Sequence, residues 1–443
     1  MSDVVFGMIL QGGPLMGSRV RDVRLAGELV KRGYPVHVWW AAERARRDPL
    51  PASVRQRWLF HIARYLRLTP VGLPRPVPDA IGRLLSRITP GDFMIRYAQR
   101  RPRMIRTLMK GFLGRICAGV ETDRFITPRF ARELRAAGVT HLMPMVSPLA
   151  PWALAARARL ERPPKVLVTF MGYEVAANYA REFGLEERFY EVLRTSARAS
   201  DFPPVVLSRD YARRVSRELD IPLDDLRIIH PGIPEPMPLE PGRARDLLEQ
   251  DFPGLRDDVP LVTFFGRQDA EKGIDLLLYA AAILERRGTA VQLVVCGPTL
   301  HGESYADACR QIAQNLRLDA HFSGYVSDEV RAALFVRSDV VVCPSIFYEP
   351  FGMVPVEAMS YGTPAVVPDT GGIVEAIEAE GQSGGVTFRS WDSGDLADKI
   401  ARVLTDDALR GRLSEAGPHV ARYYSVERMT DRVLEHMGLP PRP

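Results

Sequence analysis

The chain has 443 residues, enough for two or three domains, and its 46% hydrophobic and 26% charged residues are ordinary for a globular protein. No apolar run approaches the roughly 20 residues that span a bilayer, and the first residues, MSDVVFGMIL, lack the basic leader of a secretion signal. The four cysteines are widely spaced, so the sequence predicts neither a metal-type pair nor a disulfide framework, and a reducing cytoplasm fits.

The net charge of +5 is divided unevenly along the chain. Residues 1–234 contain 39 basic and 22 acidic residues, a net charge of +17, whereas the remainder carries −12. A preference for arginine, with only five lysines among the 59 basic residues, explains the type of basic residue but not this division. The polarity predicts a partner for the basic half.

The first elements form a predicted β-α-β unit. Residues 4–10 are an apolar run typical of a buried strand, residues 18–31 have helical spacing, and residues 36–40 form the next strand. A glycine turn at Gly12 and Gly13 joins the first strand to the helix. Because the glycines fall at 12, 13 and 17, this turn does not fit G-x-G-x-x-G and gives little support for a nicotinamide dinucleotide.

Residues 44–135 are a predicted basic insertion with 21 basic and 6 acidic residues. Trp58, Leu59, Ile62 and Leu66 fall near helical spacing among arginines, which predicts an amphipathic helix. Three roles remain open. The helix could lie on an anionic membrane, it could pack on its own domain with a solvated basic face, or the segment could line an acceptor site and attract a phosphate or carboxylate. No nucleic-acid recognition motif is present, so a nucleic-acid partner is not expected.

The domain boundary is predicted near residues 232–240, where Pro and Gly are dense and the chain becomes acidic. We therefore expect an N-terminal domain at residues 1–235, a C-terminal domain at 236–420, and a final helix at 421–443 that returns to the first domain. Residues 165–170 are a predicted strand of the first domain, and the turn that follows it contains Met171 and Gly172.

The second half restarts the alternation of strands and helices. Residues 261–265 are a predicted strand, and the loop after it carries Arg267 and Lys272 before a helix at 274–286. A later strand at 340–343 leads through a loop into a short helix at 353–360, and a further strand follows at 365–367. This order predicts a second parallel sheet.

Two carboxylates lie around the start of that short helix. Glu349 is in the loop, and Glu357 is about one turn into the helix. The helix N-terminus between them, at Gly352 and Met353, offers backbone N–H groups and a partial positive charge to a phosphate. Carboxylates accept hydrogen bonds from hydroxyls, so the arrangement predicts a ligand with hydroxyl-bearing rings on both sides of a diphosphate, that is, a nucleoside diphosphate sugar.

The segment around the two carboxylates resembles a known signature. Glu-Pro-Phe-Gly at 349–352, followed by Glu357, is similar to the E-x7-E motif of retaining GT-B glycosyltransferases of family 4. Pro-Ser before it, and Glu-Ala-Met-Ser-Tyr-Gly-Thr-Pro and Gly-Gly-Ile-Val-Glu-Ala after it, resemble the same family. The resemblance implies two doubly wound Rossmann-like domains facing across a cleft, with the acceptor on the first domain and the donor on the second.

The resemblance also implies roles for individual residues. Arg267 and Lys272 match G-R-x-x-x-x-K-G and would hold the diphosphate, Glu349 would hold sugar hydroxyls, and Glu357 would hold the ribose. The catalytic residues expected from it are Glu349, Arg267 and Lys272. The remaining donor-binding positions expected from it are Gly12, Gly13, Gly324, Val326, Phe351, Gly352, Met353 and Val354.

Met171 departs from the family, which often has His-Gly-Tyr-Asp at this point, with the histidine beside the donor sugar. A thioether does not donate hydrogen bonds and accepts them poorly, so the role of that histidine is absent or supplied elsewhere. One hypothesis is a donor that lacks a polar group near Met171 and Gly172, such as a pentose or a 6-deoxy sugar. The alternative is drift within the family.

The sequence as a whole predicts a retaining, metal-independent, hexosyltransferase-like glycosyltransferase without a cofactor, and no Asp-x-Asp metal motif occurs in it. The expected donor is UDP- or GDP-linked, and the expected acceptor is a small molecule, a glycan or a lipid-linked compound. An anionic acceptor and peripheral contact with the inner membrane face are open. Two other classes are also open: a GT-B phosphorylase and a non-catalytic protein that binds nucleotide sugars.

Overall fold

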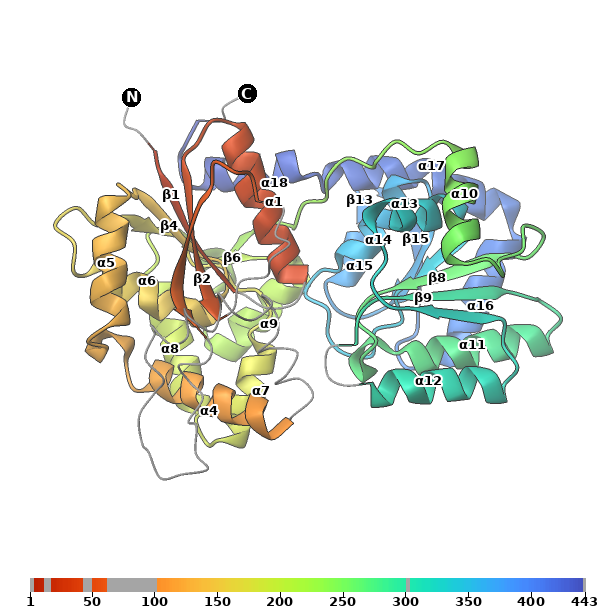
Figure 1. Ribbon diagram of the computed structural model, residues 1–443, viewed down its shortest axis with the longest axis horizontal. Helices are drawn as coiled ribbons and strands as arrows, with labels where there is room; N and C mark the ends of the chain where they lie inside the picture. Colours follow the sequence, from red (N-terminus) through yellow and green to blue (C-terminus); the bar gives the residue numbers. More distant parts are fainter. Residues whose placement is uncertain (1–3, 12–16, 43–49, 62–101, 300–302, 441–443) are drawn as a thin grey trace. The chain divides into compact units, whose positions relative to one another are not determined.

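The computed structural model describes residues 4–11, 17–42, 50–61, 102–299 and 303–440 (Figure 1). Within these ranges the chain divides into two compact units. The first contains the residues up to His230 together with those from Met429 onwards, and the second runs from Pro231 to Arg428. Each unit is built around its own parallel sheet.

The first unit has a five-stranded sheet in the order β3-β2-β1-β4-β5, and each neighbouring pair is parallel. Its strands are β1 (Phe6–Gln11), β2 (Val36–Ala42), β3 (Arg55–His61), β4 (His141–Pro144), β5 (Lys165–Val166), and the separate pair β6 (Val205–Val206) and β7 (Arg227–Ile228). Its helices are α1 (Gly17–Lys31), α4 (Pro102–Cys117), α5 (Ile126–Ala136), α6 (Ala150–Arg157), α7 (Glu174–Glu182), α8 (Glu186–Arg198) and α9 (Arg209–Leu219).

Strand β3 corrects the prediction of an amphipathic helix around Trp58. Residues 55–61 pair in parallel with β2, and Trp58 lies opposite Trp40 in the register. Leu59 and Phe60 are buried against the rest of the unit. A short apolar run does not by itself distinguish a strand from a buried helix, and here the pairing offered by β2 decides for the strand. Ile62 and Leu66 lie outside the described residues.

The predicted strand at 165–170 is regular only at β5, which pairs with β4. Beyond β5, Leu167 donates its backbone N–H to the Leu142 carbonyl at 3.1 Å, and Phe170 donates its N–H to the Val205 carbonyl, at the start of β6, at 2.8 Å. The segment therefore lies between β4 and β6. The segment ends in the turn that holds Met171 and Gly172.

The second unit has a six-stranded parallel sheet in the order β10-β9-β8-β11-β12-β15. Its strands are β8 (Leu261–Phe265), β9 (Gln292–Cys296), β10 (Ala320–Ser323), β11 (Val340–Val342), β12 (Ala365–Pro368), β15 (Gly385–Phe388), and the small pair β13 (Glu378–Ala379) and β14 (Gln382–Ser383). Its helices are α10 (Pro241–Asp251), α11 (Ile274–Arg286), α12 (Ser304–Asn315), α13 (Asp328–Arg337), α14 (Met353–Ser360), α15 (Ile373–Ala376), α16 (Ser393–Thr405) and α17 (Asp407–Tyr423).

Helices cover both faces of this sheet. On one face lie α11, α12 and α16 (Figure 1), and their apolar side chains share one buried cluster with β8, β9 and β11. On the other face, α13 and α14 pack on β8 and β11 and are themselves covered by α10 and α17. The strand order runs one way from β8 through β9 to β10 and the other way from β8 through β11. The order in which strands are added to the sheet therefore reverses between β8 and β11, and open α/β sheets bind ligands at the carboxyl ends of the strands at such a point.

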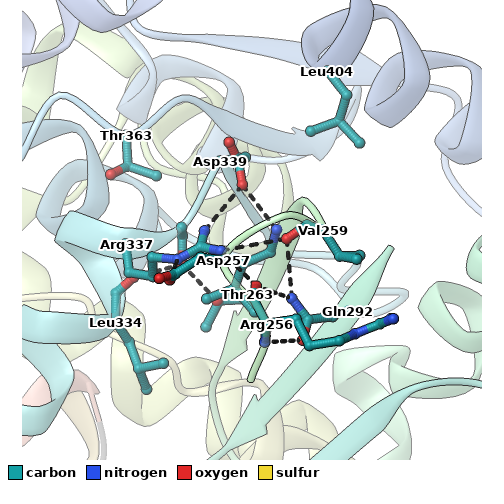
Figure 2. A network of polar contacts seen from close by, with 12 residues as sticks. Arg256, Asp257, Val259, Thr263, Gln292, Leu334, Arg337, Asp339, Thr363 and Leu404 are labelled. Carbon is teal, nitrogen blue, oxygen red and sulfur yellow. Dashed lines mark hydrogen bonds and ion pairs between the residues drawn. The ribbon is translucent and has the colours of Figure 1, made fainter. Parts of the chain in front are cut away.

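The amino ends of these strands are tied by a dense polar network (Figure 2). Gln292 is fully buried, and its Nε2 donates to the carbonyl oxygens of Arg256 at 2.7 Å and Val259 at 3.0 Å. Its Oε1 accepts the backbone N–H of Arg256 at 2.6 Å. Asp339 accepts the backbone N–H of Leu261 at 2.8 Å, so the starts of β8, β9 and β11 are joined.

The chain ends on helix α18 (Val426–His436), which begins in the second unit and continues into the first. Inside the first unit, Arg32, which directly follows α1, forms an ion pair with Asp431. The Tyr34 hydroxyl donates to the Pro440 carbonyl at 2.9 Å. These contacts hold the last residues against α1 and β2.

Candidate functional site

Glycines at the carboxyl edge of the second sheet leave the backbone free of side chains. Gly266, Gly297 and Gly324 directly follow β8, β9 and β10. Gly297 has φ of +139°, and a Cβ there would overlap the carbonyl oxygen of Gly266. Its N–H donates to the Gly324 carbonyl at 2.9 Å. The three strand ends therefore approach one another closely, and a ligand can reach the backbone.

Gln268 fastens these strand ends from within. The side chain is fully buried, and its Nε2 donates to the Gly297 carbonyl at 2.8 Å and to the Ser323 carbonyl at 2.7 Å. It fixes the backbone just before Gly324, the position predicted to contact the nucleobase. Sequence reasoning missed Gln268, because it occupies one of the unspecified positions between Arg267 and Lys272 in the motif.

Lys272 and Glu349 meet at the point where the strand order reverses. Lys272 ends a single 3-10 turn at 270–272, and Gly273 follows with φ of +65°; a Cβ there would overlap the Pro344 carbonyl oxygen. Ile346 donates its backbone N–H to Glu271 at 3.1 Å, which brings the two loops together. As a result Lys272 Nζ and the Glu349 carboxylate form an ion pair, with side chains 21% and 19% exposed.

The surroundings of Glu349 favour its charged form. Burial alone would raise the pKa of this carboxyl, but the charge of Lys272 and hydrogen bonds from Lys272 and Ser345 outweigh burial and lower it below the usual value. The Ser345 hydroxyl donates to Oε1 at 2.8 Å. The site therefore presents an oriented carboxylate, able to accept hydrogen bonds from hydroxyls.

Arg267 lies on the loop after β8 and is held by two carboxylates. Its guanidinium forms an ion pair with Asp269, Nη1 to Oδ2 at 2.6 Å, and a second with Glu271. These contacts orient the planar group beside Lys272 in sequence. An anionic ligand here would share or exchange part of these bonds.

The helix α14 begins at this edge without a side-chain cap from any described residue. Gly352 stands before its first residue with φ of +92°, and a Cβ there would lie 2.7 Å from Ile373. Met353 and Val354 form the first turn and are half-buried, whereas Phe351 is buried and packs edge-on against Tyr424 at 5.1 Å. The first backbone N–H groups of α14 therefore lie beside the Glu349 loop, where a phosphate is favoured.

Glu357 lies one turn further along α14 and is nearly buried. Its carboxylate forms an ion pair with Arg331 of α13. The guanidinium of Arg331 also lies over the ring of Phe335 at 5.6 Å. Sequence reasoning missed Arg331, because it lies outside the quoted motifs and meets Glu357 only through the packing of α13 and α14.

In the first unit, the predicted site residues Met171 and Gly172 lie in the turn before α7. Met171 is buried, and Gly172 is exposed with φ of +57°. The Gly172 N–H donates to the Tyr211 hydroxyl at 3.1 Å, which fixes the turn. Burial raises the pKa of the nearby Glu174 carboxyl. Gly12 and Gly13 lie outside the described residues.

In the second unit, Gly324 and Val326 follow β10, and α13 begins two residues beyond Val326, with Ser327 as its cap. Across the described ranges, no group of three or more His, Cys, Asp or Glu side chains is placed to hold a metal ion. No helix in the same ranges is long and apolar enough to cross a membrane.

Comparison with known proteins agrees with this geometry. Residues 248–420 match the model of the family described as glycosyl transferases group 1. An uncharacterized glycosyltransferase of Methanocaldococcus jannaschii is 33% identical over 208 residues, which are 46% of this chain and 52% of that protein. A D-inositol 3-phosphate glycosyltransferase of Nocardioides is 30% identical over 239 residues, 51% of this chain and 50% of that one.

The matched region thus spans about half the length of these curated relatives. Among solved structures, Anabaena HepE in complex with UDP and glucose superposes with a TM-score of 0.71 at 16% identity. The match covers 98% of this chain and 99% of that one. At this identity the likeness concerns the fold.

Proposed function

We propose that this chain, which has the GT-B fold and whose residues 248–420 form a group 1 glycosyltransferase domain, transfers a sugar from a nucleoside diphosphate sugar to an acceptor. The observation that carries the proposal is the ion pair of Lys272 with Glu349 at the carboxyl edge of the second sheet. It sets a cation for a diphosphate beside a carboxylate for sugar hydroxyls, within one loop of the helix N-terminus at Met353.

In this proposal the donor lies along the carboxyl edge of the sheet, with its diphosphate between the transferred sugar and the ribose. Arg267, Lys272 and the first N–H groups of α14 hold the diphosphate and stabilise the charge that develops on it as it leaves. Glu349 binds hydroxyls of the transferred sugar, and Glu357, held by Arg331, binds the ribose hydroxyls. In this proposal the protein's own cations neutralise the leaving group, so no metal ion is required.

The proposed reaction is retaining. The bond between the anomeric carbon and the diphosphate oxygen breaks with its electron pair on the oxygen. The acceptor hydroxyl then forms the new bond on the same face of the sugar, and its proton passes to the departing diphosphate oxygen. The low pKa of Glu349 supports a role as an ionised hydrogen-bond acceptor rather than as a proton donor.

For the donor we propose a UDP- or GDP-linked sugar. The bound UDP and glucose named for HepE support testing UDP-glucose first, although that likeness concerns the fold. Met171 is buried, and its thioether is a poor hydrogen-bond partner for a sugar hydroxyl. The pentose or 6-deoxy hypothesis therefore stays a proposal for the same panel of donors.

For the acceptor we propose an anionic, phosphate-bearing compound. The first half of the chain carries a net charge of +17, and several relatives are named D-inositol 3-phosphate glycosyltransferases. We propose a cytoplasmic location on the basis of four free cysteines. Peripheral membrane contact through the basic first half of the chain stays a proposal, although residues 55–61, part of the amphipathic helix predicted there, form strand β3.

The test is a melting-temperature screen of the purified protein with UDP-, GDP-, ADP- and TDP-sugars in the presence of a metal chelator. A donor at 100 times its dissociation constant should stabilise the protein by roughly 2.7 kcal/mol. The stabilisation should be reduced in Glu357→Gln, because that change removes the ribose contact. A folded sample that responds to no donor would contradict the assigned site.

A further inference from the structure

Trp391 stands in the turn between β15 and α16 with its ring in the solvent. The side chain is 67% exposed, and its backbone is left-handed, with φ of +68°. This conformation is disfavoured for residues with a Cβ, and a bulky residue there is an outlier. The other non-glycine residues with positive φ in the described ranges have polar or charged side chains: Asp220, Arg317 and Glu380.

The turn that presents this ring is held from both sides. Ser390 donates its N–H to Asp369 at 3.0 Å and its hydroxyl to the same carboxylate at 2.9 Å. Arg389 donates its N–H to Asp395 at 2.6 Å, and Asp392 caps α16 at 2.9 Å. The backbone around Trp391 is therefore fixed in the absence of a ligand, which reduces the ordering cost when a ligand binds to the ring.

The ring lies at the same edge of the sheet as the donor site. The loop that carries Asp369 follows β12, and its Gly372 N–H donates to the Glu349 carbonyl at 2.8 Å. The turn of Trp391 follows β15, which pairs in parallel with β12. Strands β11 and β15 are two places apart, so their ends are separated by about 10 Å, roughly the length of two sugar rings.

The groups around the ring suit a sugar. An indole offers a flat apolar face with a polar N–H at its edge. A pyranose matches this surface because one of its faces carries C–H bonds while its rim carries hydroxyls. Arg389 is 73% exposed on the same turn. Thr370 and Asp369 are exposed in the neighbouring loop, and the Thr370 hydroxyl lies 2.8 Å from that of Ser390, the residue before Trp391, so charged and hydroxyl groups are present close to the turn.

We propose that Trp391, with Arg389 and Thr370 beside it, forms a second carbohydrate subsite that stacks a pyranose ring of a glycan substrate or product. The inference rests on the proposed function, because it is the transfer of a sugar at Glu349 that gives a ring at this distance a role.

The test is titration of the full chain with maltose, cellobiose, lactose and mannobiose, with tryptophan fluorescence as the readout. Of the other four tryptophans, Trp39, Trp40 and Trp152 are fully buried and Trp58 is half-buried, so the exposed Trp391 should give the largest response. We expect a saturable change with at least one disaccharide at millimolar concentration. In Trp391→Gly the change should be lost, and in Trp391→Phe it should need roughly tenfold more sugar, since part of the stacking area remains.

Folding of the variants is checked by melting temperature. Trp391→Gly should melt no lower than the wild type, because glycine adopts the left-handed conformation at little cost. Tyr279→Ala is the matched control, since Tyr279 is an aromatic 46% exposed on α11 of the same unit, and it should leave the response intact. The absence of a saturable change in the wild type would overturn the subsite. Equal sugar binding by Trp391→Gly and the wild type, measured through sugar-dependent chemical shifts, would also overturn it.

Two further outcomes separate the explanations. Concentration-dependent self-association that Trp391→Gly abolishes would assign the ring to a protein contact and overturn the sugar subsite. Nucleotide sugars that shift the melting temperature of the wild type and Trp391→Gly equally, while no disaccharide binds, would overturn the subsite alone. No shift by any nucleotide sugar would instead count against the proposed function.

Discussion

A buried glutamine bonds to the backbone at each end of the second sheet, but the two side chains differ in how completely they are hydrogen-bonded. At the amino end, Gln292 is buried and uses both ends of its amide, in three hydrogen bonds to Arg256 and Val259. At the carboxyl end, Gln268 is equally buried and donates twice, but its Oε1 has no hydrogen-bond partner among the described residues. The first end is fully bonded, whereas the second retains unsatisfied polar capacity.

The charges differ in the same way. Arg337 and Asp339 at the amino end pair with each other at 3.4 Å, as Figure 2 shows, and also bond to the backbone of Val259 and Leu261. At the carboxyl end, Lys272 and Glu349 bond to each other between loops. Charged side chains that bond to the backbone stabilise the fold, whereas an ion pair between two loops can be replaced by contacts with a ligand. We therefore expect substitutions at one end to change stability and those at the other to change kinetics.

The largest expected effect is that of Glu349→Gln on turnover. The amide keeps the shape of the side chain but loses the charge that accepts hydrogen bonds from the sugar, so kcat should fall by about 10² to 10³. Glu357→Gln should mainly raise the KM for the donor, with kcat largely kept. Steady-state kinetics with the donor from the melting screen measures both, and unchanged constants in both variants would break the comparison.

Gln292→Leu should give the largest loss of stability. It removes three buried hydrogen bonds and leaves backbone groups of Arg256 and Val259 without their partner, at a cost of about 1–3 kcal/mol. Urea unfolding of the full chain measures the loss, and the kinetic constants of the folded variant should match the wild type. A changed KM for the donor would show that the amino end also contributes to the site.

Lys272→Met should change the pH dependence. In the wild type, Lys272 helps to keep the pKa of Glu349 below its usual value despite burial. The stabilisation from this pair is present above the carboxyl's unfolded pKa and is lost as the pH falls through the lowered folded pKa. Without Lys272 the effect of burial is less opposed, so the acid limb of the kcat profile should move to higher pH. A limb that does not move would separate Glu349 from the titration.

Gln268→Leu should have the smallest effect. It removes two hydrogen bonds to Gly297 and Ser323 but also the unpartnered Oε1, so the loss of stability should be smaller than for Gln292→Leu. The KM for the donor should rise severalfold, because the backbone before Gly324 is no longer fixed. A loss of stability equal to that of Gln292→Leu with an unchanged KM would make both glutamines purely structural.

The sequence predicted most of the second unit. The expected strand at 261–265 and the expected helix at 353–360 match β8 and α14, because apolar runs there are bounded by Gly and Pro. The fold class is confirmed by the structural neighbours. The roles of Glu349 and Lys272 stay predictions, although the two side chains are brought together as expected of a common site.

The sequence failed where long-range pairing decides. Residues 55–61 became β3 because β2 offered a partner, and their apolar run fits a helix equally well. Gln268 contacts a carbonyl 55 residues away, and the partner of Glu357 comes from another helix. Local patterns carry no information about such contacts, which only the folded sheet and its packed helices create.

The close approach of Gly297 to Gly266 has a consequence for how the protein can diverge. Any side chain at Gly297 would collide with the backbone of the neighbouring strand end, so this position is closed to change. Descendants of this chain that acquire new substrates must therefore alter the loops beyond the strand ends, where Tyr325 and Trp391 already project into solvent. The constraint at Gly297 thus directs change to the residues that surround this strand end.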